Sequence, residues 1–346
     1  MFRSLFIITL LFTSIFLSTV LIGSCKKEQH TKNLTLLQQE IPTGFPQPVY
    51  KFEDNPLTEE GFQLGKKLFY DGRLSIDNEH SCNSCHQQIA GFGTYEHDRS
   101  HGVNHTHTLR NAPVLFNLAW NTSFHWDGEY ATLRDAIAHP LNGSIETGET
   151  FETIIKKLEG DEEYRRLFKE VFHYPFIRPE FITKALAQFV GSFISANSRY
   201  DRYLKGTVTF TAQELNGYNL FKANCASCHK EPLFTDYSIR NNGLDIDTSL
   251  NDFGRMRITG LSSDSLKFKI PTLRNAYISA NYMHDGRYNT LHQVIDHYRF
   301  TVLPSATLDP SLRNGIPLTN TQAADLFEFL RTLTDSSFLS NPRYSN

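Results

Sequence analysis

The sequence lacks an excess of charge of either sign. Its 34 basic and 37 acidic side chains nearly cancel over 346 residues, and it contains no basic stripe of the kind that neutralises a phosphate backbone. Nucleic acid is therefore not an expected partner. The composition does not indicate disorder either, because 40% of the residues are apolar and 13% are aromatic. That content can bury the cores of two domains or of one large domain.

The N-terminus has an apolar run from Leu5 to Ile22 after a basic Arg3. This layout is typical of a secretory signal, although the run approaches the roughly 18 to 20 residues of a transmembrane anchor. Small residues before Cys25 favour cleavage, and residues 22–25 resemble a bacterial lipobox. We therefore expect residues 1–25 to be a signal peptide and Cys25 to carry a lipid, which makes the protein periplasmic and membrane-anchored.

Cysteine is scarce, with five residues in the chain. Exported proteins usually pair their thiols as disulfides, but with Cys25 assigned to the lipid the other four form two C-x-x-C-H segments, 82–86 and 225–229. This pattern attaches a c-type haem: two thiols add to the haem vinyl groups and the following imidazole binds the iron. The expected attachment residues are Cys82, Cys85 and His86 for one haem c, and Cys225, Cys228 and His229 for a second.

A single such segment could instead be a zinc half-site or a redox dithiol. A zinc site needs further Cys or His ligands at short spacing, and the two copies together consume every remaining cysteine of the exported chain. The sequence therefore favours two haems over both alternatives.

The chain also repeats itself around the two segments. The repeated motifs are Gly-x-x-Leu-Phe (65–69 and 217–221), Leu-Arg-Asn-Ala (109–112 and 273–276) and Asp-Gly (127–128 and 285–286). From the Asp-Gly pairs onward the two series keep identical spacing. We therefore predict a tether over 26–48, an N-terminal haem domain over 49–205 and a C-terminal haem domain over 206–346.

Strand-like alternation is scarce, whereas apolar residues between Phe181 and Phe193 recur at helical spacing. Thr58 and Thr211 precede polar residues suited to the first turn of a helix, so both are expected N-caps. We predict a mostly α fold with two cytochrome c-like haem domains, related by the internal repeat and connected by long irregular loops.

From residue 56 to residue 333 the chain resembles the bacterial dihaem cytochrome c peroxidases and their relatives of the methylamine-utilisation type. Beside the haem segments, the motifs that carry the resemblance are Arg-Asn-Ala-Pro (110–113), Trp-Asp-Gly (126–128), Pro-Thr-Leu-Arg-Asn (271–275) and Tyr-Met-His-Asp-Gly (282–286). The resemblance implies that hydrogen peroxide reacts at the N-terminal haem and is reduced to water. It implies that the C-terminal haem takes electrons from a small cytochrome c or cupredoxin. A homodimer is a candidate assembly because relatives are often homodimers.

The resemblance assigns catalysis to Glu146, twenty positions after Trp126. A carboxylate over an open haem face can move a proton between the peroxide oxygens as their bond breaks. Without the resemblance, Glu146 would be interpreted as a solvated loop charge. Trp126 falls where the family places an aromatic between the haems, which implies electron passage, although a core tryptophan is the simpler alternative.

A calcium ion is a further cofactor that the resemblance implies. Asn111, with backbone carbonyls near Ser279 and Asn281, matches an interdomain calcium site of relatives. Oxygen ligands suit calcium, but three of them do not fill its coordination shell.

The chain departs from the family at the N-terminal haem. Many relatives have a distal histidine that must leave the iron before peroxide binds, and the aligned residue here is Val103, which cannot bind iron. Other histidines follow nearby, although loop histidines are more often surface residues: His97, His101, His105 and His107. We expect this haem to be open even when oxidised and to need no reductive activation.

A second departure concerns the C-terminal haem, whose sixth ligand is methionine in peroxidase relatives and tyrosine in the methylamine-utilisation type. Beyond the initiator the chain has only Met256 and Met283, and the aligned position is Tyr298. Tyrosinate would lower the potential of the iron and a thioether would raise it. We expect Tyr298 to be the ligand, with Met283 as its rival and aromatic packing on a helix face as the alternative role for Tyr298.

Three functions remain open at this point. The first is a peroxidase that reduces hydrogen peroxide to water. The second uses the same peroxide chemistry to oxidise tyrosine or tryptophan side chains of a partner protein, and Tyr298 supports it. The third is an electron-transfer cytochrome in which protein ligands saturate both irons.

Overall fold

The structure, a computed structural model, describes residues 33–346, and Leu34–Asn346 form one compact unit. The predicted signal peptide, the lipidated Cys25 and the first residues of the predicted tether lie outside the described residues. Within the described part of the chain, no helix is long and apolar enough to cross a membrane.

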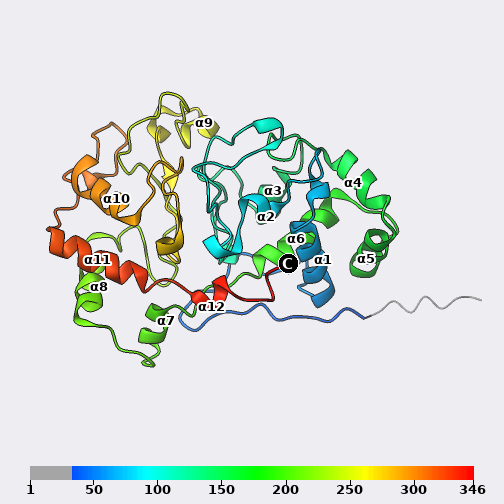
Figure 1. The fold of residues 1–346 in the computed structure, drawn as a ribbon, viewed down its shortest axis with the longest axis horizontal. Coiled ribbons are helices and arrows are strands. Elements are labelled where there is room, and N and C mark those ends of the chain that lie inside the picture. Colours follow the sequence, from blue (N-terminus) through cyan, green and yellow to red (C-terminus); the bar gives the residue numbers. More distant parts are fainter. Residues whose placement is uncertain (1–32) are drawn as a thin grey trace, which may run out of the picture. The chain divides into compact units, whose positions relative to one another are not determined.

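The described residues are mostly helical, as the sequence predicts, with long irregular connections (Figure 1). The α-helices are α1 (Glu59–Phe69), α2 (Cys82–Cys85), α3 (Leu133–Ala138), α4 (Phe151–Glu159), α5 (Glu162–Phe172), α6 (Pro179–Gly191), α7 (Arg199–Leu204), α8 (Ala212–Asn224), α9 (Met256–Thr259), α10 (Leu291–Asp296), α11 (Asn320–Arg331) and α12 (Ser336–Leu339). The short 3-10 turns are Gly72–Leu74, Gln88–Ala90, Val103–His105, Leu118–Trp120, Ser262–Asp264, Ala276–Ile278 and Pro310–Leu312. A π-helical turn, His297–Thr301, extends α10. Two short strands, β1 (Ile239–Arg240) and β2 (Phe268–Lys269), pair antiparallel.

Both predicted N-caps are confirmed. The Thr58 hydroxyl accepts a hydrogen bond from the Gly61 backbone N–H at the start of α1. The Thr211 hydroxyl accepts from the Glu214 N–H at the start of α8, and the Glu214 carboxylate accepts in return from the Thr211 N–H. Each bond satisfies a backbone donor that has no partner inside the helix.

Buried side chains form two main clusters, one with residues of α1 and α6 and the other with residues of α8 and α11. Figure 1 shows the ribbons of each helix pair, which contact each other. Both pairs cross at a glycine of the repeated Gly-x-x-Leu-Phe motif. A Cβ at Gly65 would collide with the Ala185 carbonyl, and a Cβ at Gly217 would collide with the Asp325 carbonyl. The motif therefore recurs because each helix pair needs a residue without a side chain at its closest approach.

The ends of the described chain pack onto the first cluster. Phe338 and Tyr344 are buried in it, so the last residues of the chain lie against α1 and α6. Residues 34–48 of the predicted tether are also fixed, since Leu37 donates a backbone hydrogen bond to Leu57 and Trp120 Nε1 donates to the Pro46 carbonyl. The domain boundaries at 48 and 205, and the relation of two whole domains by a repeat, stay predictions.

Local structure recurs around the two Asp-Gly pairs, but one asparagine of the second half corresponds to a different residue of the first half than the repeated sequence motifs indicate. Isolated bridges join Phe124 to Tyr130 and Tyr282 to Tyr288. Asn275 is left-handed, with φ of 58°, and precedes a 3-10 turn. In the first half, Asn117 has the same left-handed conformation, with φ of 54°, and it also precedes a 3-10 turn. Asn111, which the Leu-Arg-Asn-Ala motif aligns with Asn275, is therefore not its structural counterpart.

Candidate haem sites

The two predicted iron ligands are oriented by backbone carbonyls. His86 follows α2, and its Nδ1 lies 2.8 Å from the Phe92 carbonyl oxygen. His229 Nδ1 lies 3.2 Å from the carbonyl oxygens of both Phe234 and Pro271. A carbonyl only accepts hydrogen bonds, so Nδ1 carries the proton in each ring and Nε2 keeps its lone pair for a metal. Burial lowers the pKa of both imidazoles, which favours the neutral form that iron requires.

These acceptors could not be found from the sequence. Phe92 and Phe234 are both left-handed, with φ of 58° and 55°, and this conformation belongs to the turns that bring their carbonyls to the histidines. Every residue has a backbone carbonyl, so the residue type does not indicate which carbonyl accepts the hydrogen bond of each histidine.

The four cysteines of the two segments are free thiols, and each is half-buried. Burial raises the pKa of Cys82 and of Cys225 to about 12. A zinc site needs thiolates, and no cluster of three or more His, Cys, Asp or Glu residues in the described chain could hold a metal. The residues therefore fit thioether attachment of haem better than zinc binding.

A cavity opens beside the second segment. Cys225, Cys228 and His229 line it, and its other walls are mainly apolar residues of α10, α11 and the preceding loops. A larger cavity continues from His229 to Trp126. The arrangement of attachment thiols, an oriented imidazole and an apolar cavity fits a covalently held haem.

Tyr298 lines both cavities, whereas Met283 lines only the larger one. Tyr298 lies in the π-helical turn that extends α10, and such turns occur frequently at functional sites. Burial raises the pKa of Tyr298 to about 12, so a tyrosinate there needs a positive charge such as ferric iron. The Met283 sulfur lies 3.6 Å from Asn242 Nδ2. Tyr298 thus faces the cavity of the expected haem, and its ligation of iron stays a prediction.

Glu146 lies in a tight loop that folds it back toward the end of α3. Its backbone N–H donates to the Ser144 hydroxyl, at 3.0 Å, and that hydroxyl lies 3.1 Å from the Pro140 carbonyl. Burial raises the pKa of Glu146. A negative charge on Glu146 in turn contributes to the raised pKa of Cys82 and of Cys85. The Cys85 thiol lies 3.8 Å from the His101 carbonyl, and Val103 two residues further on bonds to Ile145, so the chain brings Glu146 near the first haem segment.

Val103 is buried, with 3% of its surface exposed. Its N–H donates to the Ile145 carbonyl, at 3.1 Å, so its loop is fastened to the residue before Glu146. The nearby histidines are exposed and lie against one another, with ring centroids 4.1 Å apart for His97 and His101 and 4.5 Å for His101 and His107. Val103, and none of these histidines, is thus the buried residue beside the Glu146 loop.

Trp126 lies on the wall of the larger cavity. Its Nε1 donates to the Asn111 carbonyl, at 2.8 Å, and its own carbonyl accepts from the Lys269 N–H, at 2.7 Å. The three calcium candidates, Asn111, Ser279 and Asn281, line the same cavity. The structure brings Trp126 together with residues of both halves of the chain, as a route between two haems requires.

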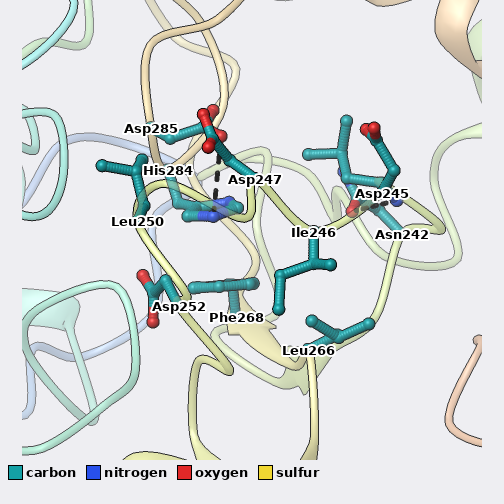
Figure 2. A pocket seen from close by; sticks show the side chains of 11 residues that line it. Asn242, Asp245, Ile246, Asp247, Leu250, Asp252, Leu266, Phe268, His284 and Asp285 are labelled. Atoms are coloured by element: carbon teal, nitrogen blue, oxygen red, sulfur yellow. Dashed lines mark hydrogen bonds and ion pairs between the residues drawn. The ribbon is translucent and has the colours of Figure 1, made fainter.

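A buried ionic cluster next to Trp126 was not predicted. Arg110 contacts Asp127, at 2.5 Å, and Asp252, at 2.6 Å. Figure 2 shows Asp252 near Phe268 and His284, whose rings stack at 3.7 Å. Burial lowers the pKa of His284 to about 4, so this ring is neutral at pH 7. Asp252 lies in an irregular segment far from Arg110 in sequence, and no motif marks it.

Comparison with known proteins identifies relatives over most of the chain. Residues 59–209 match the family model of the di-haem cytochrome c peroxidases. Cytochrome c551 peroxidase of Nitrosomonas europaea is 37% identical over 68% of this chain and 71% of its own length. The methylamine utilization protein MauG of Methylorubrum extorquens is 33% identical over 84% of this chain and 82% of its own. The crystal structure of a MauG-like protein associated with microbial copper homeostasis covers 89% of this chain and 99% of its own, with a TM-score of 0.82 and 34% identity.

Proposed function

Because this chain belongs to the di-haem cytochrome c peroxidase family, we propose that it reduces hydrogen peroxide to water with electrons from a small periplasmic donor protein. His86 and His229 would hold the two haems, and each bound haem supplies an iron that exchanges single electrons. The observation that carries the proposal is the asymmetry of the two sites. A carboxyl and a buried valine lie by the first segment, whereas a tyrosine faces the cavity of the second.

Glu146 is the proposed acid–base group. Its raised pKa lets it hold a proton nearer to neutral pH than an exposed glutamate can. It can therefore accept the proton of one peroxide oxygen and return it to the other oxygen, which leaves as water. The hydrogen bond of its backbone to Ser144 fixes the loop that carries it.

Val103 supports an open site at the first haem. Its side chain offers no lone pair, and its loop is tied to Ile145. We propose that peroxide binds the oxidised protein without a preceding reduction. Trp126, hydrogen-bonded to Asn111 between the two sites, is the proposed route for electrons.

Oxidation of side chains on a partner protein is a second candidate. Tyr298 in the wall of the second cavity favours it, since the resemblance places a tyrosine ligand in the methylamine-utilisation type. Tyrosinate ligation would stabilise oxidised iron, so that oxidising equivalents could persist until a protein substrate binds.

Rapid mixing of the oxidised holoprotein with hydrogen peroxide tests these functions. A peroxidase shows an immediate change of the Soret band and continuous peroxide consumption when a reduced small cytochrome c is added. Consumption only in the presence of a protein substrate supports the second candidate. An unchanged Soret band without turnover, together with low-spin EPR signals from both haems, would leave only an electron carrier.

The setting of the enzyme is also a proposal. We propose that Cys25 is lipidated and holds the protein on the periplasmic side of a membrane. We also propose that Asn111, Ser279 and Asn281 contribute oxygen ligands to one calcium ion, with water completing its shell. Detergent extraction of the Cys25→Ser protein tests the anchor, and metal analysis of the Asn111→Ala protein tests the calcium site.

A further inference from the structure

The proposed reaction needs protons from solvent. Each hydrogen peroxide takes up two protons and two electrons and leaves as two waters, and the electrons come from the donor protein. Glu146 can move a proton between the peroxide oxygens, but that movement adds none. A half-buried carboxyl whose pKa is raised by burial therefore needs a neighbour that carries protons from water.

A histidine, His139, lies at the start of the loop that carries Glu146. Residues 139–148 turn back on themselves: the hydroxyls of Ser144 and Thr147 both donate to the Pro140 carbonyl, at 3.1 Å and 2.6 Å. His139 directly precedes Pro140 and caps the end of α3. It is exposed to solvent, so this imidazole meets water at one end of a loop whose other end carries Glu146.

The fold of the loop brings the two residues near each other, since hydroxyls on both sides of Glu146, those of Ser144 and Thr147, donate to the carbonyl of the residue after His139. Burial is the main influence on the pKa of Glu146 and raises it, and a positive His139 is the group that lowers it. The Tyr130 hydroxyl lies 2.7 Å from His139 Nδ1 and holds the ring in place. Tyr130 has a raised pKa of about 12, chiefly through burial, so its phenol stays neutral.

The other histidine of this cluster cannot carry a proton at neutral pH. The His125 ring lies 4.7 Å from that of Tyr130 and 5.5 Å from that of His139. Burial, together with a smaller contribution from charge on His139, lowers the pKa of His125 to about 4. The remaining charged groups that act on this cluster are Asp127, Glu129, Asp135, Arg110 and Lys269.

We propose that His139 passes protons from solvent to Glu146. The imidazole takes a proton from water and gives it to the Glu146 carboxylate, which delivers it to the departing peroxide oxygen as that oxygen becomes water. His139 acts through Glu146 and does not touch peroxide, so it is a positioning residue and not a catalytic one. The relay rests on the proposed peroxidase function, and it makes His139 the point where the protons of that reaction enter.

The corresponding histidine of the second half has a different environment. His297 is 2% exposed, and both of its ring nitrogens are engaged: Nδ1 lies 2.9 Å from the Thr301 hydroxyl and Nε2 lies 3.1 Å from the Asn242 carbonyl. Its low exposure separates it from water. A solvent-exposed imidazole at this position is thus a feature of the first half, where the proposed reaction takes up protons.

The test compares His139→Gln with His173→Asn, a change at an exposed histidine that caps α5. Donor-driven peroxide reduction is measured from pH 5 to 9. The relay predicts a loss of about tenfold or more for His139→Gln, smaller than the ~10²–10⁴ of a direct acid–base group because His139 acts through Glu146. It also predicts loss of the near-neutral limb of the pH profile, whereas His173→Asn behaves as wild type.

A second measurement does not depend on turnover. The carboxyl stretch of Glu146 is identified by infrared difference spectra of the oxidised holoprotein as the band missing in Glu146→Gln. Its titration midpoint should rise in His139→Gln, because a neighbouring positive charge is lost. An unchanged midpoint, or a loss of turnover that is equal at all pH values, would overturn the relay. Absence of turnover in the wild type would reject the peroxidase instead, and the infrared shift would still decide whether the two groups are coupled.

Discussion

The segments that follow α3 and α10 begin alike and end differently. Thr132 caps α3 and Thr290 caps α10, each with its hydroxyl accepting a hydrogen bond from the third residue of the helix. Eight residues after these caps stand Pro140 in the first segment and Tyr298 in the second. Proline has no N–H and cannot continue a helix, so the first segment turns away into the Glu146 loop. The second segment widens into a π-helical turn and presents Tyr298 to the cavity.

This difference shows how two segments that start with the same capped helix can give different surroundings to the two proposed haem irons. The capped helix starts each segment in the same way, and the residue that follows it sets the course of the chain beside the proposed haem. The first half then has the exposed His139 and the buried Val103, which has no atom that can bind iron. In the second half a side chain with an oxygen ligand faces the cavity.

Loss of the Glu146 carboxyl should have the largest effect. Glu146→Gln keeps the shape but cannot exchange a proton, so peroxide turnover should fall by about 10² to 10⁴. Both haems should stay attached, as haem staining and the reduced spectrum will show. Glu152→Gln, an exposed residue in the first turn of α4, is the matched control. Normal turnover in Glu146→Gln would contradict the proposed acid–base role of Glu146 in the first half.

Replacement of Tyr298 should affect only the second haem. Tyr298→Phe removes the hydroxyl and keeps the ring, so the low-spin EPR signal of this haem should be lost or replaced while that of the first haem is unchanged. Donor-driven turnover should fall, because electrons enter through the second haem, but the direct reaction of the first haem with peroxide should persist. Tyr277→Phe, at a residue 42% exposed, should change neither spectrum. An identical low-spin signal in Tyr298→Phe would make Met283 the better candidate.

The two glycines at the helix crossings should be equally sensitive. Gly65→Ala and Gly217→Ala each place a methyl group against a carbonyl of the partner helix. Overpacking of this kind lowers the free energy of unfolding by about 1–3 kcal/mol. Denaturant unfolding of the holoprotein, followed by tryptophan fluorescence, measures it, with Gly160→Ala at the end of α4 as a milder control. A large loss for one glycine and none for the other would show that the two helix pairs are not packed alike.

The two caps give the smallest expected effect and the most direct comparison. Thr132→Ala and Thr290→Ala each leave a backbone N–H unsatisfied, at a cost of about 1 kcal/mol in the free energy of unfolding. The spectra should differ more than the stabilities, since only Thr290 starts the helix that carries Tyr298. Thr290→Ser, which restores a hydroxyl, should return both properties toward wild type. A spectral change at the second haem in Thr132→Ala would contradict the assignment of the two segments to separate haems.

Local patterns in the sequence determined the attachment chemistry. The thiols and imidazole of each C-x-x-C-H segment lie within five consecutive residues, so their spacing alone brings them together. The same holds for the N-caps Thr58 and Thr211, and for the recurrence of Gly65 and Gly217, because a turn of helix fixes which residues share a face.

Only the tertiary structure decided how each site is completed. The carbonyls of Phe92 and Phe234 that orient the histidines, the contact of Arg110 with Asp252, and the approach of His139 to Glu146 join groups through loops whose course no residue pattern encodes. Backbone carbonyls carry no side-chain identity, and ion pairs between distant segments depend on packing of the whole unit. The sequence therefore determined which groups are expected to bind haem. The course of the loops, together with packing between distant segments, decided which carbonyls, acids and cations surround them.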